Sequence, residues 1–166
     1  MIIYLVLGIA LFLVFFFWLS GLFFGAPFQS SSDKAMKTMV RLSGVKKGER
    51  VADLGSGTGK LVVEFAKKGA IVTGFEINPL LAWISRRKIK NLGLQKRARI
   101  VQANFWKTDL SRFDIITVFQ IGYIMKGLER KLGKELTKGA KVVSNTWKFP
   151  GKKPAKTQGY VRLYRF

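Results

Sequence analysis

A glycine-rich segment between residues 53 and 59 could bind a nucleotide-containing ligand. It reads D-L-G-S-G-T-G and begins inside a short apolar run, residues 50–54. Glycine at alternate positions lets the backbone approach a ligand that a Cβ atom would push away. A strand followed by such a turn and by the start of a helix is a common nucleotide-binding platform. Dinucleotide sites favour the spacing G-x-G-x-x-G, whereas the third glycine here comes one position earlier, so the segment favours a different nucleotide cofactor.

Two further polar positions follow later apolar runs. Glu76 comes after the run 70–75, and a carboxylate at this place can accept hydrogen bonds from both hydroxyls of a ribose. Asn104 and Phe105 come shortly after a third run, 98–101. Each of these features alone would be an ordinary turn or a solvated strand end. Three of them in order, each at the end of a predicted strand, indicate one ligand site.

The composition excludes several kinds of chemistry. The 166 residues include no cysteine and no histidine, so the chain has no thiolate nucleophile, no disulfide and no histidine base. We therefore expect no metal site. The 30 Lys and Arg residues against 9 Asp and Glu residues give a net charge of +21. Such an excess predicts attraction to nucleic acid or to an anionic membrane surface.

Strands and helices are predicted to alternate from residue 50 onward. Apolar runs predict strands at 50–54, 70–75, 98–101, 113–119, 140–144 and 159–166. Amphipathic spacing predicts helices at 33–42, 58–68, 78–91 and 125–136. This alternation is typical of an α/β fold with a parallel sheet and helices on both faces.

The first 26 residues predict a membrane anchor. Residues 2–24 are almost wholly apolar. As a helix they would span roughly 34 Å, enough to cross a hydrocarbon core of about 30 Å. A cleaved signal peptide is the alternative, but the run is longer than such peptides use and no basic residue precedes it. Basic residues crowd the segment 34–50, so the positive-inside rule predicts a single-pass cell-membrane protein with a cytoplasmic domain at 27–166.

The segment at 53–59 closely resembles the first motif of class I S-adenosylmethionine (SAM)-dependent methyltransferases, acid-x-G-x-G-x-G. The resemblance implies a Rossmann-like methyltransferase fold with SAM as the cofactor. The first acid would help to hold the methionine ammonium, the second would accept the ribose hydroxyls, and the polar-apolar pair would meet the adenine. The residues expected to bind SAM are Asp53, Gly55, Ser56, Gly57, Gly59, Glu76, Ile77, Asn78, Asn104 and Phe105.

A narrower resemblance covers residues 26–150. The segments 26–28, 74–78, 104–106 and 142–145 look like those of the small protein-lysine methyltransferases, a family that includes the ATP synthase c-subunit lysine methyltransferase. Hydrophobic N-terminal anchors are common in that family. The resemblance implies methyl transfer to lysine ε-amines of a membrane or membrane-adjacent protein.

The methyl acceptor is expected beyond the end of the strand at 113–119. Enzymes that methylate the amino groups of bases or of glutamine normally carry Asn/Asp-Pro-Pro-Tyr/Phe there, whereas this chain has F-Q-I-G. No dedicated base is evident, Asp33 being the least implausible acid, so the acceptor amine is expected to lose its proton to water. The candidate channel residues, each of which could equally be an ordinary packing residue, are Phe119, Gln120, Tyr123 and Trp147.

Two other functions stay open. The basic clusters at 86–90 and 148–156 could contact RNA phosphates, as in an RNA methyltransferase. The same clusters could instead form a solvated face or be attracted to the anionic inner leaflet of a membrane. A SAM-binding membrane protein without catalysis is the third possibility. Membrane tethering favours a protein substrate over ribosomal RNA, so lysine methylation is the leading hypothesis.

Overall fold

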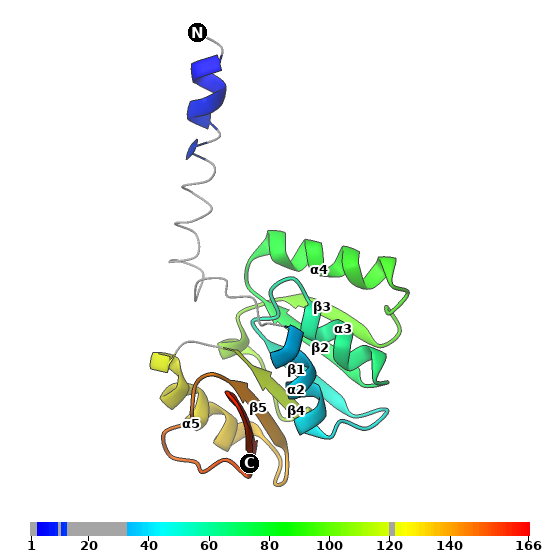
Figure 1. Ribbon diagram of the computed structural model, residues 1–166, viewed down its shortest axis with the longest axis vertical. Coiled ribbons are helices and arrows are strands. Elements are labelled where there is room, and N and C mark those ends of the chain that lie inside the picture. The colour runs from blue at the N-terminus through cyan, green and yellow to red at the C-terminus, as the bar shows by residue number, and fades with distance from the viewer. Residues whose placement is uncertain (1–2, 10, 13–32, 120–121) are drawn as a thin grey trace.

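The computed structural model describes residues 3–9, 11–12, 33–119 and 122–166 (Figure 1). Residues 3–9 and 11–12 are helical, and their apolar side chains, such as those of Ile3, Leu5 and Leu7, are exposed. The rest of the expected anchor at 1–26 lies outside the described residues. Within the described part of the chain, no helix has the length and apolar character needed to cross a membrane.

Five parallel strands form the centre of one sheet within the described residues. They are β1 (Arg50–Leu54), β2 (Ile71–Glu76), β3 (Ala98–Gln102), β4 (Ile115–Val118) and β5 (Lys141–Asn145). The spatial order β3-β2-β1-β4-β5 means that the chain, having reached one edge at β3, returns to the other side of β1. The strand order therefore reverses between β1 and β4, the position at which α/β folds bind their ligands.

Two antiparallel strands complete the sheet beyond β5. β7 (Val161–Arg165) pairs with β5, and β6 (Lys156–Gln158) pairs with β7 across a two-residue turn at 159–160. The sequence predicts a last strand at 159–166, which β7 confirms. It does not predict β6, because the three residues of β6 are all exposed and have no apolar pattern.

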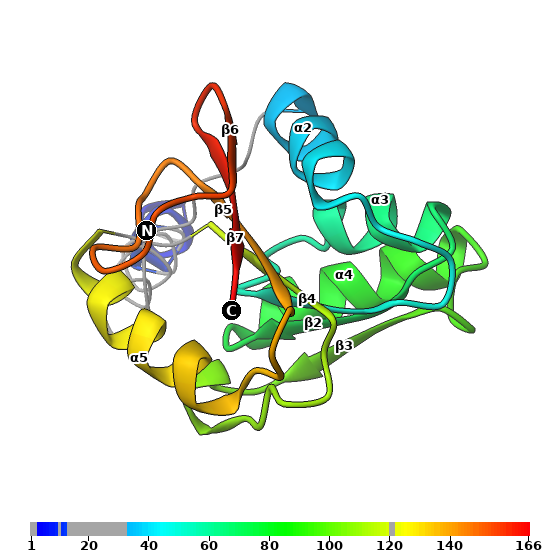
Figure 2. The same ribbon diagram turned by 90° about the horizontal axis from the view of Figure 1, so that it is seen from below.

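Helices cover both faces of the sheet, as Figure 2 shows. Three helices lie on one face: α2 (Asp33–Ser43), α3 (Lys60–Lys67) and α4 (Pro79–Asn91). On the other face lies α5 (Met125–Glu135), preceded in the chain by two short 3-10 helices, η1 (Phe105–Lys107) and η2 (Gly122–Ile124). Between β3 and β4 the described chain contains η1 but no α-helix, so loop residues such as Leu110 and Phe113 fill that part of the core.

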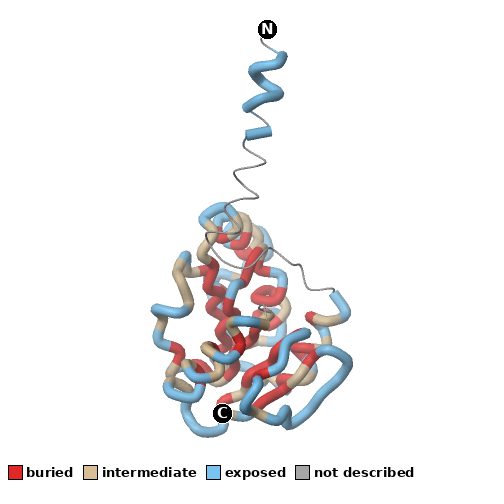
Figure 3. The backbone as a smooth tube through the Cα atoms, turned by 90° about the vertical axis from the view of Figure 1, so that its left-hand side faces the viewer, coloured by how far each residue is buried: buried red, intermediate tan, exposed pale blue. Residues whose placement is uncertain are grey.

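Alternate residues of the strands fill the two cores. Val51 points toward α2 and α3, whereas Ala52 and Leu54 of the same strand point toward α5. This follows from the two-residue period of a strand, which sends successive side chains to opposite faces. Figure 3 shows the buried residues concentrated in the sheet and on the helix faces turned toward it. The expected Rossmann-like arrangement of parallel strands with helices on both faces is confirmed.

Close packing between β2 and the glycine-rich turn predicts a stability test. A Cβ atom at Gly74 would lie 2.7 Å from Ile100 Cδ1 and 2.7 Å from both Cβ and Oγ of Ser56. Gly74→Ala should therefore lower the free energy of unfolding by about 1–3 kcal/mol, because such overpacking forces neighbours to shift. Urea denaturation of the detergent-solubilised full chain measures the change.

Gly133→Ala is the matched control for this variant. Gly133 lies in α5, and a Cβ atom there would have no neighbour within 4 Å. Alanine favours a helix over glycine by up to about 1 kcal/mol, so this variant should be as stable as the parent protein or more stable. Equal stability of the two alanine variants would show that the turn does not pack against β2 as described.

Candidate functional site

The glycine-rich turn after β1 is held against the end of β2 by backbone hydrogen bonds. The amides of Gly55 and Ser56 donate to the Phe75 carbonyl at 2.9 and 3.0 Å. Gly55, Gly57 and Gly59 have φ angles of 77°, 53° and 71°, in the left-handed region where residues with a Cβ atom are strained. The turn therefore needs glycine for its backbone conformation as well as for space.

Glu76 joins the turn to the start of α4. Its carboxylate is buried, and Oε2 accepts a hydrogen bond from the Gly57 amide at 2.7 Å while Oε1 accepts one from the Asn78 amide at 2.8 Å. Each oxygen keeps a second lone pair, so the same carboxylate can also accept hydrogen bonds from a ligand. The structure thus fixes the orientation of the acid that the sequence predicts for ribose binding.

Asp53 is the second buried acid of the site. Its carboxylate accepts a hydrogen bond at 2.7 Å from the Thr117 hydroxyl, which comes from the neighbouring strand β4. Burial raises the pKa of Asp53 to about 7; the hydrogen bond from Thr117 opposes the shift, and the nearby carboxylate of Glu76 adds to it. None of the four ion pairs among the described residues involves either acid. Two neighbouring carboxyl groups are therefore buried here without a cationic side chain paired to them.

The other residues predicted for the cofactor surround these two acids. Asn78 caps α4, its side chain accepting from the amides of Leu80 and Leu81. Asn104 caps η1 in the same way, accepting from the Trp106 amide at 3.0 Å. Ile77 and Phe105 are half-buried. The structure therefore brings the predicted residues to one edge of the sheet, the one formed by the carboxyl ends of β1 to β5. It also gives both asparagines a capping function.

The predicted acceptor residues lie at the same edge, beyond β4 and β5. Phe119 is half-buried, and Tyr123 is 77% exposed. Trp147 packs over Gly122, where a Cβ atom would lie 2.7 Å from the indole ring. Gln120 lies outside the described residues. The structure thus places Trp147, which follows β5, beside η2, which follows β4.

Thr146 is a feature of this region that the sequence does not predict. Its φ angle of 70° is the one positive value among the described non-glycine residues, and it is costly for a β-branched side chain. The Trp147 amide donates to the Asn145 carbonyl at 2.9 Å, which closes a strained γ-turn around Thr146. Arg162 Nη1 donates to the carbonyls of Thr146 and Tyr160, both at 2.9 Å. Stored strain of this kind is common at functional sites, and here it sets the position of Trp147.

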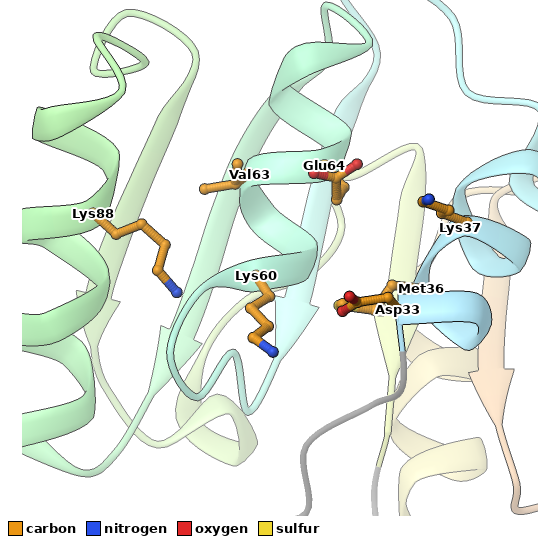
Figure 4. A pocket seen from close by; sticks show the side chains of 7 residues that line it. All are labelled: Asp33, Met36, Lys37, Lys60, Val63, Glu64 and Lys88. Carbon is orange, nitrogen blue, oxygen red and sulfur yellow. The ribbon is translucent and has the colours of Figure 1, made fainter.

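A pocket of about 280 Å³ lies beside the turn, between α2, α3 and Lys88 of α4 (Figure 4). In Figure 4, Asp33 and Met36 reach from α2 toward Lys60 at the start of α3. Lys88 donates to the Thr58 carbonyl at 2.7 Å, so it also supports the turn. Burial and the neighbouring Lys60 lower the pKa of Lys88. Neither Asp53 nor Glu76 lines this pocket, so it flanks the pair of buried acids.

Comparisons with known proteins agree with this geometry. Residues 53–156 match the model of the ANTKMT methyltransferase domain family. The mouse ATP synthase c-subunit lysine N-methyltransferase is 33% identical over 80% of this chain and 53% of its own length. A protein-lysine N-methyltransferase of Saccharolobus islandicus is 31% identical over 77% of this chain and 81% of its own length. The chain spans about half the length of the mammalian relatives it matches.

The solved structures define the fold class. An RNA methyltransferase from Salinibacter ruber, in complex with S-adenosyl-L-homocysteine, superposes with a TM-score of 0.78 at 24% identity, over 83% of this chain and 92% of that one. At this identity the likeness shows the fold alone, which is that of class I SAM-dependent methyltransferases. The family match is more specific, and the chain belongs to the ANTKMT methyltransferase domain family.

The residues of the site fit SAM, the cofactor of this class. SAM carries a cationic sulfonium and a cationic ammonium, and the site offers two buried carboxyl groups without a paired cation. Glu76 can accept ribose hydroxyls, and Asp53 can hold the ammonium directly or through water. Among the described residues, no group of three or more potential metal ligands lies close enough together to bind a metal ion.

The raised pKa of Asp53 predicts how SAM affinity depends on pH. Pairing with an ammonium requires the ionised carboxylate, so the contribution of Asp53 is complete only well above pH 7 and is lost as the pH falls through 7. The ratio of the SAM affinities of the parent protein and Asp53→Asn should rise about fivefold between pH 6 and 7.5, below the pH at which an α-amino group loses its proton. Isothermal calorimetry at both pH values measures the ratio. A constant ratio would show that Asp53 does not pair with the cofactor.

Proposed function

We propose that this protein is a SAM-dependent protein-lysine N-methyltransferase that acts at a membrane. The observation that carries the cofactor assignment is the pair of buried, unpaired carboxyl groups of Asp53 and Glu76 beside the glycine-rich turn. Membership of the ANTKMT methyltransferase domain family supports methyl transfer as the reaction. The names of the mouse and Saccharolobus relatives support lysine as the acceptor.

The residues of the site form a cofactor-binding side and an acceptor-binding side. SAM supplies a methyl group on a cationic sulfur, which an amine can attack in line with the breaking bond. Glu76 and Asp53 hold the two ends of the cofactor on the β1–β2 side. Phe119, Tyr123 and Trp147 line the acceptor side and would exclude water from the reacting amine. Gln120 is proposed to line the same acceptor channel.

The acceptor amine must lose a proton before it can react. Deprotonating a lysine with a pKa near 10.4 costs about 4.6 kcal/mol of free energy at pH 7. An apolar channel next to a cationic sulfur would lower that pKa by desolvation and by charge repulsion. Among the described residues, no hydrogen bond joins an acid to Phe119, Tyr123 or Trp147, so we propose that the amine loses its proton to water; Asp33 is the one exposed acid at this edge. Outside the cofactor site, Glu49, Glu64, Asp114 and Glu135 form ion pairs, Glu129 accepts from Gly151, Asp109 accepts from Ser111, and Asp33 begins α2.

The proposed acceptor is a lysine of a membrane or membrane-adjacent protein. The apolar run at 2–24 supports a single-pass anchor. The exposed apolar side chains of residues 3–9 are those of a helix that would be surrounded by lipid. Two relatives are named for protein substrates, the ATP synthase c-subunit and the adenine nucleotide translocase. The c-subunit is therefore the first substrate to test.

Transfer of labelled methyl groups tests the proposed reaction. The full chain, methyl-labelled SAM and isolated membranes should give label on lysine of a membrane protein, at a rate that rises between about pH 7 and 9 as more amine becomes neutral. Isolated ribosomes are assayed in parallel. The Gly57→Arg variant, whose side chain would enter the turn at a positive φ angle, should give no label and so measures background transfer. Label confined to an RNA nucleoside would replace the lysine assignment with RNA methylation.

Protease protection tests the proposed cytoplasmic location of the catalytic domain. Basic residues between 34 and 50 support this orientation through the positive-inside rule. Protease added to spheroplasts should leave residues 33–166 intact, whereas protease added to inverted membrane vesicles should digest them. An antibody against the C-terminal residues detects the fragment. The opposite pattern would overturn the orientation.

A further inference from the structure

Exposed aromatic side chains gather at the edge of the sheet where β1 to β5 end. Of the seven tryptophans and tyrosines described, only Tyr164 is buried, although burial of such large rings normally stabilises a fold. The exposed rings of the α/β domain come from the second turn of α4, from η1 and η2, from the residue two beyond β5, and from the turn before β7. They are Trp83 (55% exposed), Trp106 (39%), Tyr123 (77%), Trp147 (44%) and Tyr160 (75%).

Exposed lysines surround the same edge. They lie in the first two turns of α2, in the first turns of α3 and α5, in η1 and directly after Trp147: Lys34, Lys37, Lys60, Lys126, Lys107 and Lys148. None of them takes part in the four ion pairs among the described residues, which lie at the amino ends of β1 and β5 and within α3 and α5. Of the acids at this edge, Asp53 and Glu76 are buried, and the exposed one is Asp33.

The lysines occupy positions that are unfavourable for the helices themselves. The N-terminus of a helix carries a partial positive charge and is stabilised by acidic side chains. The first turns of α3, α4 and α5 contain no acid, and Lys60 and Lys126 stand in two of them. Helix termini and lysines therefore add positive charge at one edge, which an external anionic surface would compensate.

We propose that this edge, defined by the five exposed aromatic residues and the six lysines, lies flat against an anionic lipid bilayer. Trp and Tyr prefer the headgroup level of a membrane, and lysines are attracted to its anionic lipids. Lysine is depleted at protein–protein interfaces, so the lysine ring favours lipid over a protein partner. The edge contains the cofactor and acceptor residues, so docking would open the active site toward the membrane; this orientation of the site rests on the proposed function.

The position of the chain entry supports the same arrangement. α2 begins at Asp33 on this edge, and the eight residues 25–32 separate it from the apolar run at 2–24. At most about 3.6 Å per residue, that linker keeps the edge within roughly 30 Å of the end of the run. A domain held that close by one end would bring the edge, rather than the opposite side of the sheet, to the bilayer surface.

A single fluorescent label can detect the docked edge, because the chain contains no cysteine. Gln158→Cys places the label in β6 near the docking edge. Thr137→Cys places it before β5, at the opposite edge, which is formed by the amino ends of the parallel strands. Both positions are exposed. The full chain is reconstituted in nanodiscs with or without phosphatidylserine, and quenching by spin-labelled lipid headgroups is measured. We expect strong quenching at residue 158 in anionic nanodiscs, loss of most of it at high salt, and little quenching at residue 137.

A charge-matched pair of variants separates docking from net charge. Replacing Lys34, Lys107, Lys126 and Lys148 with glutamine should abolish most of the quenching at residue 158. Replacing the exposed Lys46, Lys47, Lys68 and Lys138, which lie at the opposite edge, should leave it intact. Equal effects of the two sets, or quenching that appears only when a membrane-protein substrate is added, would overturn lipid docking. SAM affinity measured on the same samples tests the proposed cofactor site separately.

Discussion

Two carboxyl groups that are buried side by side, without a cationic side chain paired to either, constrain everything else at the site. Charged groups are costly to bury, and the chain has 30 Lys and Arg residues that could have compensated them. Instead, Glu76 is stabilised by two backbone amides and Asp53 by one hydroxyl, and burial raises the pKa of Asp53 to about 7. The protein therefore presents two preorganised carboxyl groups whose burial a cationic cofactor would compensate.

The rest of the structure supports this pair from three directions. The positive φ angles of the glycine turn bring the Gly57 amide to Glu76, and Lys88 holds the turn from the side of α4. β4 supplies Thr117 to Asp53 and ends beside the acceptor residues. The strained turn at Thr146 then positions Trp147 over Gly122, so that the cofactor and acceptor sides meet along one sheet edge.

The sequence predicts the elements that carry strong local patterns. Apolar runs locate β1 to β5 and β7 to within a few residues, and glycine spacing with two acids predicts a cofactor site whose residues lie at one edge of the sheet. It does not predict β6, whose residues are exposed, or the antiparallel direction of the last two strands, because both depend on pairing rather than on local pattern. The conformation of Thr146 also depends on tertiary contacts: Arg162 and Tyr160 hold it from β7 and the turn before it. The capping function of Asn78 and Asn104 could have been recognised, since each precedes a helix.

The SAM affinity of Glu76→Gln tests whether the buried acids bind the cofactor; it is measured by calorimetry on protein whose thermal unfolding shows that it is folded. Hydrogen bonds to charged groups contribute about 1.5–3 kcal/mol, so losing the carboxylate charge should weaken SAM binding by roughly 10- to 100-fold. Glu129→Gln is the matched control, because Glu129 accepts its backbone hydrogen bond from Gly151, outside the cofactor site. Weak binding by the first variant and unchanged binding by the second are expected. Unchanged affinity in a folded Glu76→Gln protein would show that Glu76 does not bind the cofactor.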